Sequence, residues 1–132
     1  MDTENRERDY EYTTLMNMLH VSVSKHLLNE HFSLVWANDF YYELIGYTKE
    51  EYETIYHNHC DSYYSNDELG IHDEDDWNVL GEAVTKALSE GKSGYSIIGR
   101  IRRKDGDYIL VQMSATFVDD YIDGYQVSYT AM

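Results

Sequence analysis

Histidine and cysteine are the residues in this chain that could bind a transition metal. His57, His59 and Cys60 lie close together, and His72 follows a short distance later. Both residue types are good zinc ligands, but a His-x-His-Cys run within one loop has no recognised zinc-finger spacing. We therefore predict no metal at these residues, and keep a zinc or other transition-metal site as the alternative.

Motifs for covalent or phosphate chemistry are absent from the sequence. A Ser/His/Asp triad could be assembled from many residues, but no nucleophile motif supports one. There is also no glycine-rich loop of the kind that binds phosphate groups. Neither pattern therefore supports a catalytic site in this chain.

The charge of the chain excludes two classes of partner. It has 25 acidic residues against 10 Lys and Arg, a net charge of −15. Binding to a nucleic-acid backbone or to an anionic membrane needs an excess of basic residues. No apolar run approaches the roughly 18 residues of a membrane span. With Cys60 alone there is no internal disulfide, and we expect a reducing, cytoplasmic compartment.

Acidic and basic residues occupy different parts of the sequence. Residues 43–76 contain eleven acids and one base, a net charge of −10. The basic cluster consists of Arg100, Arg102, Arg103 and Lys104. We interpret these segments as a solvated acidic face and a basic strand edge that discourages edge pairing. The alternative is a docking surface for a partner.

The length of 132 residues fits one domain, which we place at residues 19–132 after a flanking segment at 1–18. Near the end of that segment, apolar residues recur at helical spacing and form one face of a short helix. Such a helix is marginal alone and needs a partner surface. The face consists of Tyr12, Leu15, Met16 and Leu19.

The first half of the domain reads as a hairpin followed by short helices. Residues 20–28 and 32–37 are predicted strands. Asn38 can cap a helix that ends at Gly46, and Thr48 with Glu51 forms a capping box for the next helix. Residues 56–72 are polar and read as a loop with up to one helical turn.

The second half reads as one long helix and three strands. Residues 73–89 are a predicted helix with acids in its first turn and an apolar stripe. The stripe consists of Trp77, Leu80, Val84 and Leu88. Strands are predicted at 94–103, 107–118 and 124–131, with a tight turn at 104–107 and a looser one at 119–124. This order predicts an α+β domain with helices on one face of an antiparallel sheet.

Several fragments in order along residues 19–132 resemble the PAS family, and the C-terminal part resembles its PAC motif. The fragments are Trp36–Asp39, Leu44–Tyr47, Thr48–Glu51, Ile71–Asp75, Arg100–Gly106 and Asp123–Gly124. Each fragment is weak alone, but their order and spacing are specific. The sequence departs from the family pattern at Asp73, where many family members have proline after the histidine.

The resemblance implies a PAS-like five-stranded antiparallel sheet with helices packed on one face. It also implies a sensory module that passes a signal to an attached output domain, which would be missing from this chain. We expect that domain to be a cyclic-dinucleotide cyclase or phosphodiesterase, or a histidine kinase.

In PAS proteins, ligands lie between the inner face of the sheet and the long helix. Alternation along the last three strands assigns three sets to that inner face. They are Tyr95, Ile97, Gly99 and Ile101; Val111, Met113, Ala115 and Phe117; and Tyr125, Val127, Tyr129 and Ala131. Gly81 shares the helical stripe, where a missing side chain would leave room for a ligand or a tyrosine. The predicted ligand-binding residues are Trp77, Gly81, Val84, Tyr95, Ile97, Met113 and Tyr129.

The resemblance also bears on cofactors, and we predict neither haem nor flavin. Haem-binding relatives carry a histidine on the long helix, but residues 77–90 contain none and His72 precedes the helix. Flavin photosensors carry an Asn-Cys-Arg-Phe-Leu-Gln stretch. Its nearest counterpart is Asn58–Asp61, which lacks the arginine.

The resemblance implies a sensor module with no catalytic activity of its own, and a small acidic enzyme is kept only as an outside case. Two functions then remain open from the sequence. The first is a module that binds an unidentified small ligand. The second is a ligand-free module for dimerisation and signal relay, in which Tyr12, Leu15, Met16 and Leu19 pack against a second copy. Leu110 and Tyr121 on the outer sheet face would contribute to that homodimer.

Overall fold

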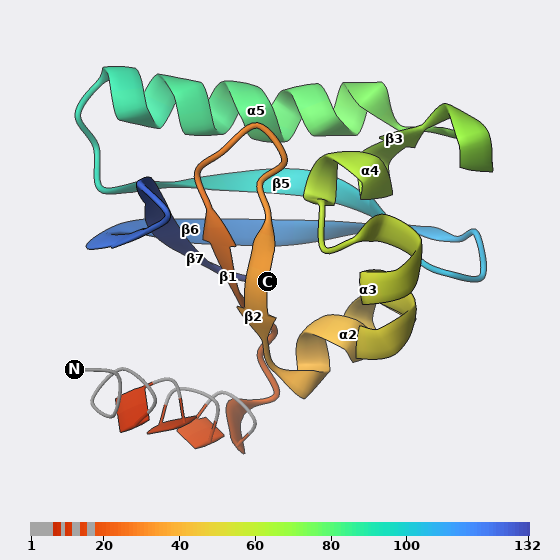
Figure 1. The fold of residues 1–132 in the computed structure, drawn as a ribbon, viewed down its shortest axis with the longest axis horizontal. Coiled ribbons are helices and arrows are strands. Elements are labelled where there is room, and N and C mark those ends of the chain that lie inside the picture. Colours follow the sequence, from red (N-terminus) through yellow and green to blue (C-terminus); the bar gives the residue numbers. More distant parts are fainter. Residues whose placement is uncertain (1–6, 9, 12–13, 16–17) are drawn as a thin grey trace.

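The computed structural model contains a five-stranded antiparallel sheet and a long helix that lies along one of its faces (Figure 1). It describes residues 7–8, 10–11, 14–15 and 18–132. The strand order is β2-β1-β7-β6-β5. The strands are β1 (Val23–Leu27), β2 (Leu34–Ala37), β5 (Gly94–Arg102), β6 (Tyr108–Ile122) and β7 (Tyr125–Ala131). The predicted fold class is confirmed.

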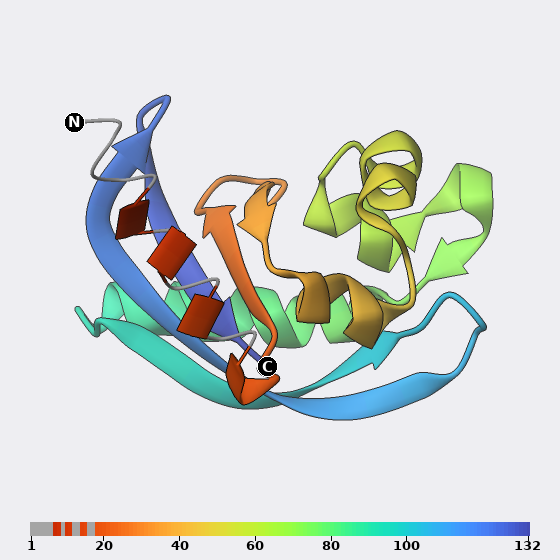
Figure 2. The same ribbon diagram turned by 90° about the horizontal axis from the view of Figure 1, so that it is seen from below.

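Three short helices follow the β1–β2 hairpin and lie together at one end of the sheet (Figure 2). They are α2 (Asp39–Ile45), α3 (Lys49–Tyr56) and α4 (Cys60–Tyr64). Both predicted caps are present. The Asn38 side chain accepts a hydrogen bond from the Tyr41 backbone N–H, and Thr48 and Glu51 exchange the two bonds of a capping box. Gly46 ends α2 in the left-handed conformation that glycine adopts without strain.

The segment at 56–72, predicted to be mostly loop, contains more structure than its polar composition indicated. It holds α4, a short sheet of β3 (Ser65–Asn66) with β4 (Ile71–His72), and a 3₁₀ turn η1 (Asp67–Leu69) between them. Tyr56, Cys60, Tyr63 and Tyr64 are buried here. The segment therefore forms one wall of the core.

The long helix α5 (Glu74–Ser89) packs against the sheet through residues spaced three and four apart. Leu80 and Ala87 are buried, and Trp77 and Val84 are partly buried against the core. Leu88, predicted to belong to this stripe, is 45% exposed. Ala87 takes its place.

The connection between β6 and β7 is tighter than predicted. β6 continues to Ile122, and the turn consists of Asp123 and Gly124, both with positive φ. That two-residue turn suits the right-handed twist of a hairpin. The irregularity expected at 119–124 lies instead within the strand, where the register shifts between Phe117 and Tyr121.

The inner face of β7 is opposite to the one predicted. Thr130 pairs with Ala115, and Ser128 pairs with Phe117. Directly paired residues of an antiparallel sheet share a face, and Ala115 and Phe117 are on the inner one. The set Tyr125, Val127, Tyr129 and Ala131 therefore lies on the outer face. In agreement, the Tyr129 ring lies 5.6 Å from Nζ of Lys25, which it pairs with on β1.

The described parts of the N-terminal segment are helical and lie on the side of the sheet away from α5 (Figures 1 and 2). Leu15 and Leu19 are 52% and 64% exposed. Tyr12 and Met16, the other members of the predicted helix face, lie outside the described residues. Across the described ranges, no helix is both long and apolar enough to cross a membrane.

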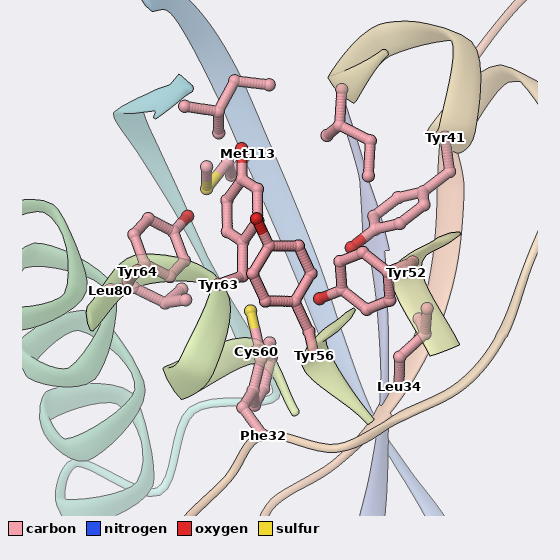
Figure 3. Close-up of a cluster of buried hydrophobic side chains, with 12 residues drawn as sticks. Phe32, Leu34, Tyr41, Tyr52, Tyr56, Cys60, Tyr63, Tyr64, Leu80 and Met113 are labelled. Carbon is pink, nitrogen blue, oxygen red and sulfur yellow. The ribbon is translucent and has the colours of Figure 1, made fainter. Parts of the chain in front are cut away.

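The core between α5 and the hairpin is rich in tyrosine (Figure 3). The rings of Tyr41, Tyr52, Tyr56 and Tyr63 form consecutive tilted or edge-to-face contacts, with centroids 5.4 to 6.1 Å apart. Aromatic rings favour these arrangements, which add to the free energy gained by burial. The rings fill much of the space where a PAS ligand was expected.

Candidate functional site

A small cavity remains in the core between the inner sheet face and the helices. Its free volume is about 40 Å³, which is room for roughly three water molecules. The strands, the hairpin loop and α2, α4 and α5 all contribute side chains to it. The lining residues are Ser24, His26, Phe32, Tyr41, Ile45, Cys60, Tyr63, Tyr64, Leu80, Tyr95, Ile101, Met113, Thr130 and Met132.

One side of this apolar cavity is polar. Ser24, His26, Tyr95 and Thr130 line it, and their buried side-chain polar atoms have no hydrogen-bond partner among the described residues. Buried polar groups in native proteins are nearly always paired, because an unpaired one costs about 1–3 kcal/mol. Water in the cavity, or another bound molecule, would complete the hydrogen bonds of these four residues.

His26 occupies the centre of this polar side. It lies on β1, paired with Ser128 of β7, and its ring stacks on Phe32 with centroids 4.3 Å apart. Complete burial lowers the pKa of His26 to about 3, because burial disfavours the charged imidazolium. The ring is therefore neutral at physiological pH and offers one hydrogen-bond donor and one acceptor.

Tyr95 on β5 and Thr130 on β7 extend the polar side. Thr130 influences the pKa of the Tyr95 phenol, but the two hydroxyls form no hydrogen bond of normal geometry. Burial raises the Tyr95 pKa above its usual range, so the phenol remains a donor. Both hydroxyls therefore line the cavity without a partner of normal hydrogen-bond geometry.

Cys60 lines the cavity from the first residue of α4. Burial raises the pKa of its thiol to about 12. Because the thiolate is the reactive form, this cysteine is neither a poised nucleophile nor a ready metal ligand. It acts as a small apolar side chain in the wall.

The structure brings together only part of the predicted ligand-binding set. Tyr95 and Met113 line the cavity, and Trp77, Val84 and Ile97 pack around the same core. Two of the predicted residues do not line the cavity. Tyr129 is on the outer face, and a Cβ on Gly81 would meet no atom within 4 Å, so Gly81 neither packs closely nor bounds the cavity. Leu80, its neighbour on α5, lines the cavity instead.

Sequence reasoning missed Ser24, His26 and Thr130. The hydrophobic alternation pointed to the other face because that face is also buried: Val23 and Leu27 are each 9% exposed and Val127 is fully buried. A signal was nevertheless present, since polar residues alternate with apolar ones along β7, and Ser24 and His26 are polar residues of the neighbouring strand β1.

The predicted cluster of His57, His59, Cys60 and His72 does not come together. Cys60 faces the cavity and His57 is exposed. His72 lies on β4, where its Nδ1 is 3.1 Å from Oε1 of Glu74, and it does not line the cavity.

The basic cluster is paired with the acidic segment inside the domain. Arg100 bonds Asp76, Arg102 bonds Asp73, and Lys104 bonds Glu51. These pairs connect the edge strand β5 and its turn to the starts of α5 and α3. Three acids of the acidic segment are therefore paired with the basic cluster within the domain, and neither interpretation from the sequence anticipated this.

The fold and cavity define a PAS domain, and the comparisons with known proteins agree. The family model of the PAS fold matches residues 34–129, so the chain belongs to the PAS family. No curated protein matches the chain.

Solved structures show the same fold at low sequence identity. A PAS domain from a two-component sensor histidine kinase is 18% identical with a TM-score of 0.59, and 96% of each chain is covered. A domain of a sensory box sensor histidine kinase/response regulator from Geobacter sulfurreducens is 16% identical with a TM-score of 0.56, over 93% of this chain and 92% of that one. A LOV protein of Rhodobacter sphaeroides is 16% identical with a TM-score of 0.58, over 84% and 57%.

Proposed function

We propose that this PAS domain is a sensory module that binds a small polar molecule in the cavity and relays its presence to an output domain. The carrying observation is the group of unpartnered polar atoms on Ser24, His26, Tyr95 and Thr130. Their donors and acceptors converge on one space with apolar walls, which is the usual form of a small-molecule site.

The size and charge of the cavity restrict the ligand. A free volume of about 40 Å³ accepts only a few non-hydrogen atoms unless tyrosine rings rotate. The lining contains no Asp, Glu, Lys or Arg, so nothing there neutralises an ionic ligand. We therefore expect an uncharged molecule with both a hydrogen-bond donor and an acceptor. A flavin ring system would require several tyrosines to leave.

The strands that contact the ligand also lead to both ends of the domain. Met132 lines the cavity, and its backbone pairs with Ser22 through N–O distances of 2.9 and 3.3 Å. A ligand that moves Thr130 or Met132 would thus shift the residues before β1 and after β7 together. We propose that this pair of segments carries the signal, through a homodimer, to a histidine kinase or a cyclic-dinucleotide cyclase or phosphodiesterase domain.

One observation favours a second candidate. The tyrosine rings leave little free space, as a module that binds nothing and serves only dimerisation and relay would require. That candidate gives the four unpartnered polar residues no role, so we rank it second. On either reading, this domain catalyses no reaction of its own and acts in the cytoplasm.

Mass spectrometry of small molecules released on denaturation tests the proposal. The wild-type protein should release one compound in near-stoichiometric amount, and the double variant His26→Leu/Thr130→Val should release none. Ser128→Ala is the matched control, because Ser128 is also buried without a partner but does not line the cavity. No released compound from wild type, or equal release from the double variant, would favour the relay module.

A further inference from the structure

Three metal-ligand side chains meet on the surface where the β1–β2 loop contacts the start of α4. His31 belongs to the loop, His59 immediately precedes α4, and Asp61 is in its first turn. A backbone hydrogen bond joins the two segments, from Asp61 N–H to the His31 carbonyl at 3.3 Å. The three side chains are partly buried, so their positions are more restricted than those of fully exposed residues.

Their geometry is close to that of a metal site. Nδ1 of His31 lies 2.9 Å from Oδ2 of Asp61, and the rings of His31 and His59 stack with centroids 4.0 Å apart. One ligand atom from each residue lies within 4.8 Å of the other two. In a tetrahedral zinc site with bonds of about 2.0–2.1 Å, ligand atoms are roughly 3.3 Å apart. Because the two rings are stacked nearly parallel, at 4°, one imidazole must turn out of the stack before both nitrogens can face a common ion.

We propose that His31, His59 and Asp61 bind one divalent transition-metal ion, with zinc as the best match to two imidazoles and a carboxylate. Three protein ligands leave a fourth position for water, which the partial exposure of the site permits. This is not the His57–His72 group suggested by the sequence. It shares only His59 with that group, and its other two members come from the hairpin loop and α4.

The surroundings of His31 support this assignment. Metal-binding histidines usually donate their second ring N–H to a carboxylate, which fixes the ring orientation. Here Nε2 of His31 lies 3.4 Å from Oε1 of Glu30, while Nδ1 lies 2.9 Å from Oδ2 of Asp61. The ring is thus presented with the correct nitrogen toward the proposed ion.

The position of the site gives the metal a structural consequence. Phe32 and Cys60, which follow His31 and His59 in the chain, both line the cavity. An ion held by the loop and by α4 would fix these two walls relative to each other. This consequence rests on the function proposed above, whereas metal binding can be measured without any cavity ligand.

Calorimetric titration of the tag-free, chelator-treated full chain with zinc chloride tests the proposal. Wild type should bind one equivalent, and His31→Ala and His59→Ala should each weaken binding at least tenfold, a loss typical of damage to a metal site. His57→Ala is the matched control two residues from His59, and His72→Ala tests the separate contact with Glu74; both should bind like wild type. Circular dichroism establishes that each variant is folded.

The opposite results would overturn the site. These are no saturable binding by wild type, or equal weakening by His57→Ala and His59→Ala. Cobalt(II) provides a second readout that does not depend on the variants. We expect d–d absorption without a thiolate-to-metal charge-transfer band, because Cys60 is buried in the cavity wall. A thiolate band would assign the ion to Cys60 and contradict this ligand set.

Discussion

Arg102 on β5 and Asp73 at the start of α5 form a buried ion pair, with 2.6 Å between Nη1 and Oδ2. Their side chains are only 12% and 7% exposed. The Tyr108 hydroxyl donates to the other oxygen of Asp73 at 2.7 Å, and Nη2 of Arg102 donates to the Tyr63 carbonyl at 3.0 Å. Asp73, the residue that departs from the family pattern, therefore connects the long helix to β5 and β6.

Breaking the ion pair between Arg102 and Asp73 should lower the stability of the fold substantially. Arg102→Met keeps most of the apolar part of the side chain but removes the positive charge that pairs with the buried Asp73 carboxylate. We therefore expect the free energy of unfolding to fall by about 3–5 kcal/mol. Arg100→Ala is the control, because Arg100 is 44% exposed and solvent screens its pairing with Asp76, so we expect a much smaller loss. Urea denaturation measures both, and equal losses would contradict the assignment.

His26 should make stability depend on pH. Its pKa is about 3 in the folded protein and near 6.5 when unfolded, so below about pH 6.5 the unfolded chain binds the extra proton. The stability that neutral, buried His26 contributes is therefore fully present above about pH 6.5 and is lost as the pH falls below it. Between about pH 7.5 and about pH 5 the loss attributable to His26 should be about 2 kcal/mol.

The variant His26→Leu isolates this effect, because the other titrating groups are common to both proteins. Urea denaturation measures the unfolding free energy of wild type and of His26→Leu at each pH. We expect the difference between the two proteins to change by about 2 kcal/mol between about pH 7.5 and about pH 5. A difference that does not change with pH would mean that His26 is not buried in its neutral form.

Asn38 should contribute more to stability than a helix cap alone. Its Oδ1 accepts bonds from the backbone N–H groups of Val23 at 3.0 Å and Tyr41 at 3.2 Å, and its Nδ2 donates to the Val21 carbonyl at 2.8 Å. Asn38→Ala should lower the free energy of unfolding by about 2–4 kcal/mol, because it leaves buried backbone groups unpaired.

Thr48→Ala is the matched control for Asn38→Ala, since Thr48 caps the exposed start of α3. We expect it to cost about 1 kcal/mol. Thermal or urea unfolding of both variants checks the comparison. If the two substitutions cost the same, the hydrogen bonds of Asn38 to β1 add nothing to capping.

The proposed dimer depends on the N-terminal helical segment. Leu15→Glu/Leu19→Glu should halve the molar mass measured by light scattering, because two charges would enter an apolar interface. Leu69→Glu, at a residue that is similarly exposed at 51%, is the control and should leave the mass unchanged. Deleting residues 1–18 should have the same effect as the double variant. A mass unaffected by both changes would exclude this segment from the interface.

Local signals in the sequence were sufficient for the starts of α2 and α3. Asn38, Thr48 and Glu51 act on backbone groups within three residues, so their roles can be predicted without tertiary structure. The cavity could not be predicted in this way. Alternation along β7 shows that two faces exist, but Val127 and Thr130 are both buried, and only pairing with β6 shows which one faces α5.

Residues brought together from distant segments were also beyond local reasoning. The pairing of Arg102 with Asp73 and of His31 with Asp61 requires the sheet, the hairpin loop and the helices to be assembled first. The core role of residues 56–64 was hidden because their tyrosines occur among polar residues. The tertiary structure decides which of those rings point inward.

A high-resolution crystal structure of the protein as purified tests the central claim most directly. We predict electron density in the cavity for an uncharged molecule larger than water, hydrogen-bonded to His26 and to the hydroxyl of Thr130 or Tyr95. Rotation of a tyrosine ring to admit it would agree with the proposal. A cavity that stays near 40 Å³ and holds only water or nothing would contradict ligand sensing.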